Sequence, residues 1–362
     1  MIFVYDSILT DYPRLNGEKS DAPRIQRAID NTYNGILSIP KGDYYIDSPI
    51  LITNRCSLKM HSAARLIATE EMEFVVTYDG LANYHALSIF NDDGSIYDNL
   101  GIFIEGGDID GNGMASCLKI TNAHHYTLTN TALHNGKDYG LYVGSADGHL
   151  YELICNNVYC KCTMKGLSGN IGIYSAKSDC HYNDCIVVDY TTGMKIDGFA
   201  NRLTRCHIWS GTVAPENMDM QTWSDLYAER KKKHNLKLYD YATLVEKYNN
   251  EIPEMLKNSV AFHIKGGYNV LDGCYADTAE IGYLIEHDTR LISCDFFNNG
   301  LMGLKNSTAI KHIKGKLQIM ASTFRGPVGT EKLYEGDGKD VEWISNTCIG
   351  GELLNPPKEF EK

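Results

Sequence analysis

The chain of 362 residues contains 43% apolar residues and 22% charged residues, so it has enough apolar side chains for a packed core. Acidic residues outnumber basic residues 46 to 34, and the one basic run covers residues 230–233, which argues against a nucleic-acid-binding surface. No apolar stretch approaches the ~18 residues of a membrane-spanning helix, and the N-terminal residues lack the pattern of a secretory signal. We therefore expect no nucleic-acid partner, no membrane association and a cytoplasmic location, with a phage virion as the alternative.

The first predicted element is a helix within residues 19–35. Asp21 or the serine before it can cap this helix, and Pro23 suits its first turn. Ile25 and Ile29 give the helix one apolar face. Because the open end of a β-repeat exposes unpaired strand edges, we expect this helix to cap the N-terminal end of the fold.

A sequence repeat dominates the rest of the chain. Five segments align by a cysteine, and two of the intervals, 185 to 206 and 274 to 294, are nearly equal; the aligned residues are Cys155, Cys185, Cys206, Cys274 and Cys294. Short strands, Asn/Gly/Asp turns and a period of about 20–25 residues are typical of a solenoid of parallel β-coils, and we count about ten coils. The cysteines then stack at one inward position as small apolar side chains, rather than as metal ligands.

Residues 212–257 interrupt this repeat. They contain two stretches with a helical pattern, TWSDLYAERKKKHN and ATLVEKYNNEIPEML. Insertions in a solenoid tend to line its binding face. We therefore expect one β-helix domain over residues 1–362, with a partly helical insertion that serves as lid or wall of a substrate groove.

The segment from the first helix through KGDYYI, together with GGDIDGNG at 106–113, resembles the pectate-lyase-like superfamily, which includes polygalacturonases and phage tailspike depolymerases. The resemblance implies an all-β fold, a right-handed parallel β-helix, with a saccharide substrate lying along one sheet. Many members are homotrimers, so the resemblance also implies a homo-oligomer. His263-Ile264-Lys265 is similar to the last element of the polygalacturonase catalytic pattern, whereas LSGN at 167–170 stands where that pattern has an Asp pair.

Alternation along three strands predicts one row of outward-facing charged residues. If the isoleucines of TGMKID, VAFHIK and IGYLIE point inward, their neighbours point outward; these are Lys195, Asp197, His263, Lys265 and Glu286. Neighbouring strands lie ~4.8 Å apart, which places Asp197 and Glu286 about two strand spacings apart, near the window of about 5–9.5 Å that glycosidases use between carboxyl groups. The alternative is an exposed ladder of ion pairs, each contributing about 0–1 kcal/mol.

Further candidates lie in the turns before the same sheet and near the insertion. Asp277 and Glu280 are acid/base candidates, although Asp277-Thr278 also fits an ordinary turn. Candidates for substrate contacts, besides Lys195 of the charged row, are the acid and the aromatic side chains Asp189, His207, Trp209 and Trp223.

Three functions fit these residues. The favoured one is a glycoside hydrolase or transglycosylase whose acid/base pair comes from Asp197, Asp277, Glu280 and Glu286. The runner-up is a polysaccharide lyase in which Lys265 or His263 removes a proton from C5 of a uronate. A third is a non-catalytic, tailspike-like glycan-binding protein. No cofactor and no metal are expected, because the Asp-rich turn at 108–113 lacks the glutamate of a calcium loop.

Overall fold

The structure is a computed structural model that describes residues 6–32, 35–79, 102–123, 125–144, 152–211, 213–216, 218–236, 246–247, 252–298, 300–350 and 352–360. Its contacts divide the chain into two compact units. Unit 1 comprises Met1–Lys161 with Ile173–Cys185, and unit 2 comprises Cys162–Gly172 with Ile186–Lys362. Within the described residues, no helix combines the length and the apolar character needed to cross a membrane.

Parallel strands form three sheets, named A, B and C, which contain 12, 11 and 10 strands. Each coil of the chain adds one strand to sheet A, then one to sheet B, then one to sheet C. The prediction of a right-handed parallel β-helix is confirmed, and the fold has about eleven coils instead of about ten.

Unit 1 begins the three sheets. Its strands in sheet A are β1 (Ser7–Ile8), β2 (Ile36–Ile39), β5 (Ser57–Met60), β8 (Phe103–Glu105), β11 (Thr127–Thr129), β14 (Ile154–Asn156) and β17 (His181–Asn183). Sheet B contains β3 (Gly42–Ile46), β6 (Ala64–Ala68), β9 (Asp108–Asp110), β12 (Ala132–His134) and β15 (Tyr159–Lys161). Sheet C contains β4 (Ile50–Ile52), β7 (Phe74–Asp79), β10 (Ser116–Thr121), β13 (Tyr139–Val143) and β16 (Ile171–Ser175).

Unit 2 has the same coil architecture. Its strands in sheet A are β20 (Arg202–Thr204), β23 (Asn269–Asp272), β26 (Thr289–Ile292), β29 (Leu317–Met320) and β32 (Val341–Ile344). Sheet B contains β18 (Ile186–Val188), β21 (His207–Trp209), β24 (Tyr275–Asp277), β27 (Asp295–Phe297), β30 (Thr323–Gly326) and β33 (Thr347–Gly350). Sheet C contains β19 (Thr192–Ile196), β22 (Val260–Ile264), β25 (Ile281–Ile285), β28 (Thr308–His312) and β31 (Lys332–Glu335).

A buried cysteine column follows the turn between sheets A and B in unit 2. Cys206, Cys274 and Cys294 are each fully buried and follow residues with a left-handed backbone (φ of 52°, 63° and 51°). The predicted alignment of Cys155 with this column is wrong. Cys155 lies inside β14 and pairs with Tyr182 of β17, because a small apolar thiol also fits an inward position in the middle of a strand.

Small residues at the second position of the sheet C strands let the sheets approach closely in unit 2. Gly193, Ala261, Gly282 and Ala309 are all buried. A Cβ added at Gly282 would lie 2.6 Å from a ring carbon of Phe296 and 2.7 Å from the carbonyl oxygen of Ala309. These distances are shorter than van der Waals contact between packed groups. The close approach of Phe296, in β27 of sheet B, therefore leaves no room for a side chain at Gly282.

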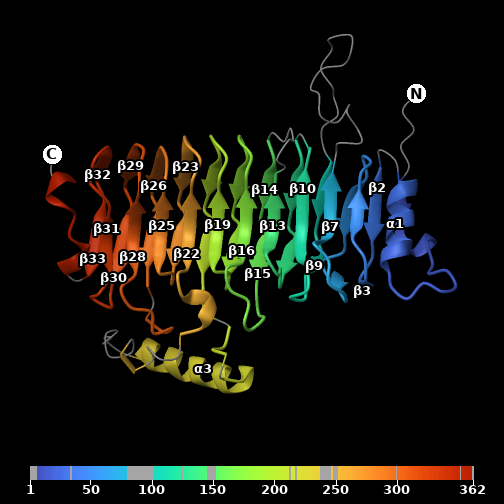
Figure 1. The fold of residues 1–362 in the computed structure, drawn as a ribbon, viewed down its shortest axis with the longest axis horizontal. Coiled ribbons are helices and arrows are strands. Elements are labelled where there is room, and N and C mark those ends of the chain that lie inside the picture. The colour runs from blue at the N-terminus through green and yellow to red at the C-terminus, as the bar shows by residue number, and fades with distance from the viewer. Residues whose placement is uncertain are drawn as a thin grey trace, which may run out of the picture. The chain divides into compact units, whose positions relative to one another are not determined.

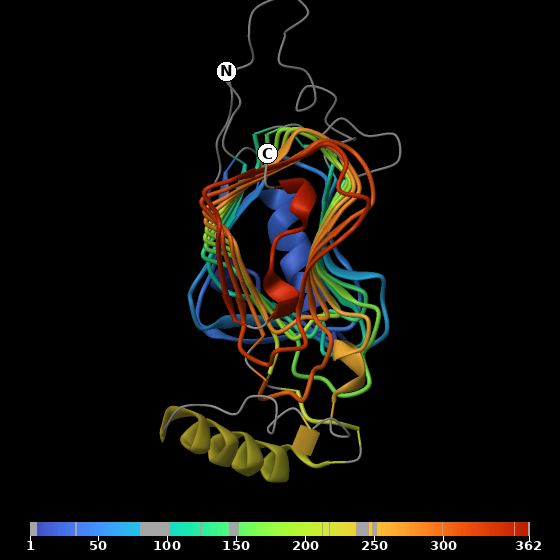
Figure 2. The same ribbon diagram turned by 90° about the vertical axis from the view of Figure 1, so that its left-hand side faces the viewer.

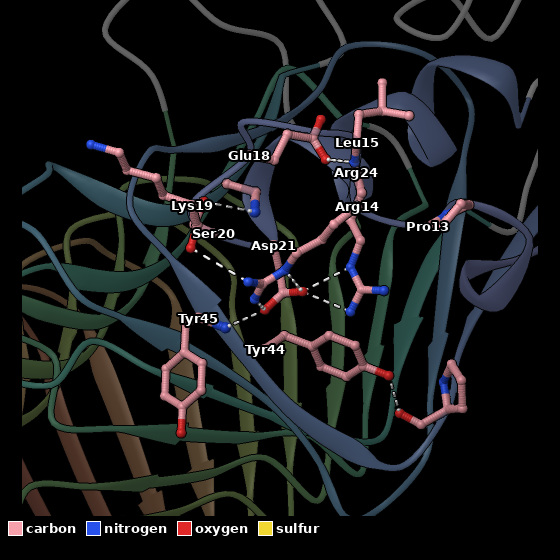
Figure 3. A network of polar contacts seen from close by, with 12 residues as sticks. Pro13, Arg14, Leu15, Glu18, Lys19, Ser20, Asp21, Arg24, Tyr44 and Tyr45 are labelled. Atoms are coloured by element: carbon pink, nitrogen blue, oxygen red, sulfur yellow. Dashed lines mark hydrogen bonds and ion pairs between the residues drawn. The ribbon is translucent and has the colours of Figure 1, made fainter.

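Helix α1 (Ala22–Asn31) lies within the segment predicted to cap the N-terminal end, and the 3-10 helix η1 (Leu9–Asp11) precedes it. Its apolar face is buried and contacts β4. Asp21, at the start of the helix, accepts hydrogen bonds from Arg14 (2.5 Å), Arg24 (2.7 Å) and the backbone of Tyr45 (2.8 Å) (Figure 3). Burial raises the pKa of Asp21, but the hydrogen bonds from Arg14 and Tyr45 and the nearby Arg24 charge outweigh it and leave the pKa below its ordinary value.

The insertion of unit 2 forms helix α3 (Met220–Leu236), which lies outside the coils (Figure 2), and the short 3-10 helix η4 (Glu254–Leu256). Two further 3-10 helices, η5 (Glu352–Leu354) and η6 (Lys358–Phe360), follow the last strand. Trp223 packs with Met255, Met302 and their neighbours in a small apolar cluster. Most of the second helical stretch predicted in the insertion, residues 242–256, lies outside the described residues.

Candidate functional site

The outer face of sheet C in unit 2 carries a row of polar side chains. The strands β19, β22 and β25 lie side by side (Figure 1). Lys195 pairs in register with His263, and His263 pairs in register with Leu284. The inward neighbours of these residues, Met194, Phe262 and Tyr283 among them, are fully buried. Alternation therefore places Lys195 and His263 on the solvent side of the sheet.

A second outward row follows the ends of the same strands. Ile196, Ile264 and Ile285 are in register, so the residues after them, Asp197, Lys265 and Glu286, are also neighbours. Asp197 and Glu286 are half-buried and Lys265 is exposed. The structure thus brings together the five charged residues that the alternation predicts, while their chemical roles stay predictions.

One close pair stands out in these rows. The Nε2 atom of His263 lies 2.6 Å from Oε1 of Glu286, and both side chains are partly buried. In the neutral tautomer that donates Nε2–H to the carboxylate, Nδ1 carries a lone pair and can accept a proton. No described residue forms a hydrogen bond with Nδ1. The carboxylate of Glu286 would then orient the ring and stabilise the imidazolium that protonation creates.

Sheet B carries a different group of candidates. Burial raises the pKa of Asp277 to about 6, although hydrogen bonds from Thr278 and Tyr275 and the Arg325 charge oppose this shift. The ring of His207 stacks on Tyr275 at 4.6 Å, and burial lowers the pKa of His207. Trp209 is half-buried at the end of β21. Asp277, His207 and Trp209 therefore share sheet B and are not part of the sheet C rows.

Three predicted site residues have structural contacts instead. Glu280 accepts a hydrogen bond from the backbone of Asn258 at 2.6 Å. Asp189 is buried and accepts one from the backbone of Gly211 at 2.7 Å. Trp223 is 1% exposed and packs in the apolar cluster of the insertion, and its predicted contact with a substrate stays a prediction.

Sequence reasoning missed the cationic side of the sheet B group. The Arg325 guanidinium lies 5.1 Å from the ring of Phe297 and 5.6 Å from that of Tyr275, and it contacts Asp295 at 3.5 Å. Thr323, two residues before Arg325, pairs with Asp295, which in turn pairs with Tyr275. Aligning STFRG with CDFF places Arg325 beside Phe297. The contact with Tyr275 is harder to predict, because Arg325 lies two coils from Tyr275.

The residues described in the structure include no group of three His, Cys, Asp or Glu side chains arranged to hold a metal ion. In the Asp-rich turn of unit 1, Asp110 Oδ1 accepts hydrogen bonds from the backbone of Asn112 (2.8 Å) and from Nδ2 of Asn135 (3.0 Å). Gly106 and Gly107 have φ of 76° and 68°. These contacts fit a tight turn that links neighbouring coils.

No family model and no curated protein sequence matches the chain. Among solved structures, it is similar to the mannuronan C-5 epimerase AlgE4 A-module of Azotobacter vinelandii (TM-score 0.54, 10% identity, 96% of each chain). It is also similar to an N-terminal fragment of gene product 12 of bacteriophage Phi29 (TM-score 0.50, 10% identity, 96% of this chain and 72% of that one). PfbA, a surface adhesin of Streptococcus pneumoniae, gives a TM-score of 0.49 at 10% identity, over 96% of this chain and 92% of that one. At 10% identity, the likenesses to the epimerase module and to the phage fragment show the β-helix fold alone.

Proposed function

We propose that the protein is a carbohydrate-active enzyme that removes the C5 proton of a uronate unit in a glycan, in the lyase or epimerase class. The observation that carries this proposal is the contact between His263 and Glu286 on the outer face of sheet C, with lysines in register beside it. The sequence alone favoured a hydrolase, and the geometry of this pair favours the runner-up.

Each residue of this site has its own role in proton removal. His263 accepts the C5 proton at Nδ1, and Glu286 positions its ring and balances the new positive charge. Lys265, beside Glu286, faces the carboxylate attached to C5 and stabilises the negative charge that develops there. The electron pair of the broken C5–H bond moves toward this carboxylate group.

Two outcomes follow from this intermediate. In epimerisation, a proton returns to C5 from the opposite face and no other bond breaks. In elimination, the pair forms a C4=C5 double bond, the C4–O bond breaks, and the leaving oxygen takes a proton. Both outcomes share proton removal at C5, so both exchange or lose the same hydrogen.

The sheet C rows suit a glycosidase less well. A glycosidase needs a carboxylic acid and a second carboxylate across the scissile bond. In the sheet C rows, the Glu286 carboxylate is hydrogen-bonded to His263, so it is not free to act as a pair with Asp197. One observation does favour hydrolysis as a second candidate function: the pKa of Asp277, raised to about 6, suits a general acid on sheet B.

The test is hydrogen exchange at C5. The protein is incubated in D2O with polymannuronate, polyguluronate or polygalacturonate, and NMR measures deuterium at C5 while ultraviolet absorbance detects unsaturated ends. We expect His263→Gln to lower the rate by roughly 10²–10⁴-fold. Glu286→Gln should lower kcat less and change its pH profile, because Glu286 acts through His263. The matched control is Lys311→Gln, which removes a lysine of the same sheet that pairs with Glu335 at 2.8 Å.

Other results would point elsewhere. Cleavage of a glycan without deuterium uptake, lost in Asp277→Asn and kept in His263→Gln, would support the hydrolase and refute proton removal. Binding without turnover on every glycan would support the non-catalytic alternative. The trimeric state and the cytoplasmic location stay predictions, the first testable by light scattering.

A further inference from the structure

We propose a second carbohydrate-binding site on the outer face of sheet A in unit 2, for an acidic sugar unit. The site is a cavity of about 260 Å³ at the start of strands β23, β26 and β29. Its charged and aromatic lining consists of Arg202, Tyr268, Asp288, Arg290 and Lys316. This site lies on a different sheet from the rows that contain His263 and Glu286.

Two arginines supply the positive charge of this cavity. Arg202 pairs in register with Val270, and Val270 pairs in register with Arg290. The two arginines therefore flank Val270 at two strand spacings, about 9.6 Å between backbones, a distance that two guanidinium side chains can bridge onto one ligand. Both side chains are exposed, and neither forms an ion pair with any described residue. Two exposed guanidinium groups, with no carboxylate within ion-pair distance among the described residues, form a positive patch in a chain of net charge −12 and indicate a site for an anion.

Two further charged residues, Lys316 and Asp288, line the cavity. Lys316 pairs with Glu342 at 2.7 Å. Asp288 Oδ1 accepts a hydrogen bond from the backbone of Lys316 at 2.8 Å and lies 3.8 Å from Nδ1 of His287. The positive charge available to a ligand comes from Arg202 and Arg290, and Asp288 is the one carboxylate among the described residues that line the cavity.

Tyr268 has an unusual conformation for its residue type. Its φ is 60°, a left-handed backbone that costs a bulky residue about 1–2 kcal/mol and that Asn or Gly adopts more readily. Its side chain is also 67% exposed, so the ring gains little from burial. The backbone carbonyl of Tyr268 accepts a hydrogen bond from Arg202 at 3.3 Å, which holds the turn against the arginine. Ala200, in the turn of the preceding coil, has a similar φ of 55°, so the backbone conformation belongs to the coil turn. The exposed ring of Tyr268 beside the cavity is free to pack on a ligand.

These features together specify the ligand. Arginine binds carboxylate in a two-pronged geometry, and a tyrosine ring packs on the apolar face of a sugar. A uronate unit offers both groups on one ring. This ligand class rests on the proposed function, in which a uronate glycan is the substrate, and the sheet A site would hold the glycan away from the reacting unit.

Calorimetric titration of the full chain tests the site. The probes are short oligomers of mannuronate and galacturonate, a neutral glucose oligomer and inorganic phosphate. We expect uronate binding that salt weakens, and a loss of about tenfold or more in affinity with Arg290→Gln, as for removal of one charge-assisted contact. Tyr268→Asn should also weaken binding, yet leave the unfolding temperature equal or higher because Asn tolerates this backbone better. The control is Lys339→Gln, which removes the same charge from an 80% exposed side chain.

The binding results either support or overturn the site on sheet A. Unchanged uronate affinity in both variants, equal binding of phosphate or of the neutral oligomer, or no binding of any probe would overturn it. If uronate binding depends on Arg290 and Tyr268 while C5 exchange is absent, the site stands and the proposed function fails. If exchange occurs and is lost in His263→Gln, while uronate affinity is unchanged in Arg290→Gln and Tyr268→Asn, the proposed function stands and the sheet A site fails.

Discussion

Replacing Asp277 by Asn should make the protein more stable at neutral pH. Asp277 has an ordinary pKa of 3.8 that burial raises to about 6 in the folded protein. The folded state therefore binds this proton more tightly than the unfolded state, and the free energy of unfolding falls as pH rises from about 4 to about 6. Above this range the folded protein holds a half-buried charge.

The size of this effect follows from the same shift. At about 1.36 kcal/mol for each pKa unit, the difference corresponds to roughly 3 kcal/mol, an upper bound because solvent screens the exposed part of the side chain. Asn has nearly the same shape and never ionises. Asp277→Asn should therefore raise the free energy of unfolding by about 1–3 kcal/mol at about pH 8 and change it little at about pH 4.

Unfolding in guanidinium chloride at about pH 8 and about pH 4 measures the free energy of unfolding of the variant and of the wild type. The control is Asp272→Asn, which removes the same charge from an exposed position on the preceding strand. A variant that is less stable than the wild type at pH 8, or equally stabilised at both pH values, would refute the reasoning. In that case Asp277 would be held by its hydrogen bonds as a carboxylate.

Three further predictions concern packing and thiol chemistry. Gly282→Ala should lower the free energy of unfolding by about 1–3 kcal/mol in denaturant titrations, because the new Cβ would meet Phe296 at 2.6 Å. Trp223→Ala should cost about 3–5 kcal/mol, because the ring is buried and lies 4.8 Å from the buried guanidinium of Arg230; unchanged stability would show that α3 is not anchored there. Iodoacetamide should label Cys348 first in the native protein, because the other ten cysteines are buried; mass spectrometry of the labelled peptides would reveal any different order.

Most of the fold follows from features that repeat in the sequence. The alternating strands recur once per coil, and Gly or Ala occupies the second position of the sheet C strands from β13 to β28, so each coil supports the assignment of the next. The error at Cys155 shows the limit of aligning one residue type. Its coil places Val158 after the left-handed Asn157, where later coils place cysteine, and both side chains satisfy the same small apolar position.

The sequence predicts which residues of the sheet C site are neighbours on the same face, but it does not predict which of their side chains are in contact. Alternation is enough to place His263 and Glu286 on one face of neighbouring strands. Whether His263 contacts Glu286 or a neighbouring lysine depends on side-chain rotamers, which strand periodicity does not determine. The raised pKa of Asp277 depends on its burial in the folded protein, and the opposing charge of Arg325 comes from two coils away, so the shift could only be found in three dimensions.

The same Asp277 variant also separates a structural from a catalytic interpretation of the raised pKa. If the pKa of this carboxyl is raised only because it is buried, Asn should increase stability and leave turnover unchanged. If Asp277 is the acid of a hydrolase, the same substitution should increase stability and abolish turnover, since an amide cannot donate the required proton. Residues needed for catalysis often lower the stability of the folded protein, so replacing them can increase stability while activity is lost. Measuring both quantities on one variant therefore assigns the chemistry to sheet B or leaves it with His263 on sheet C.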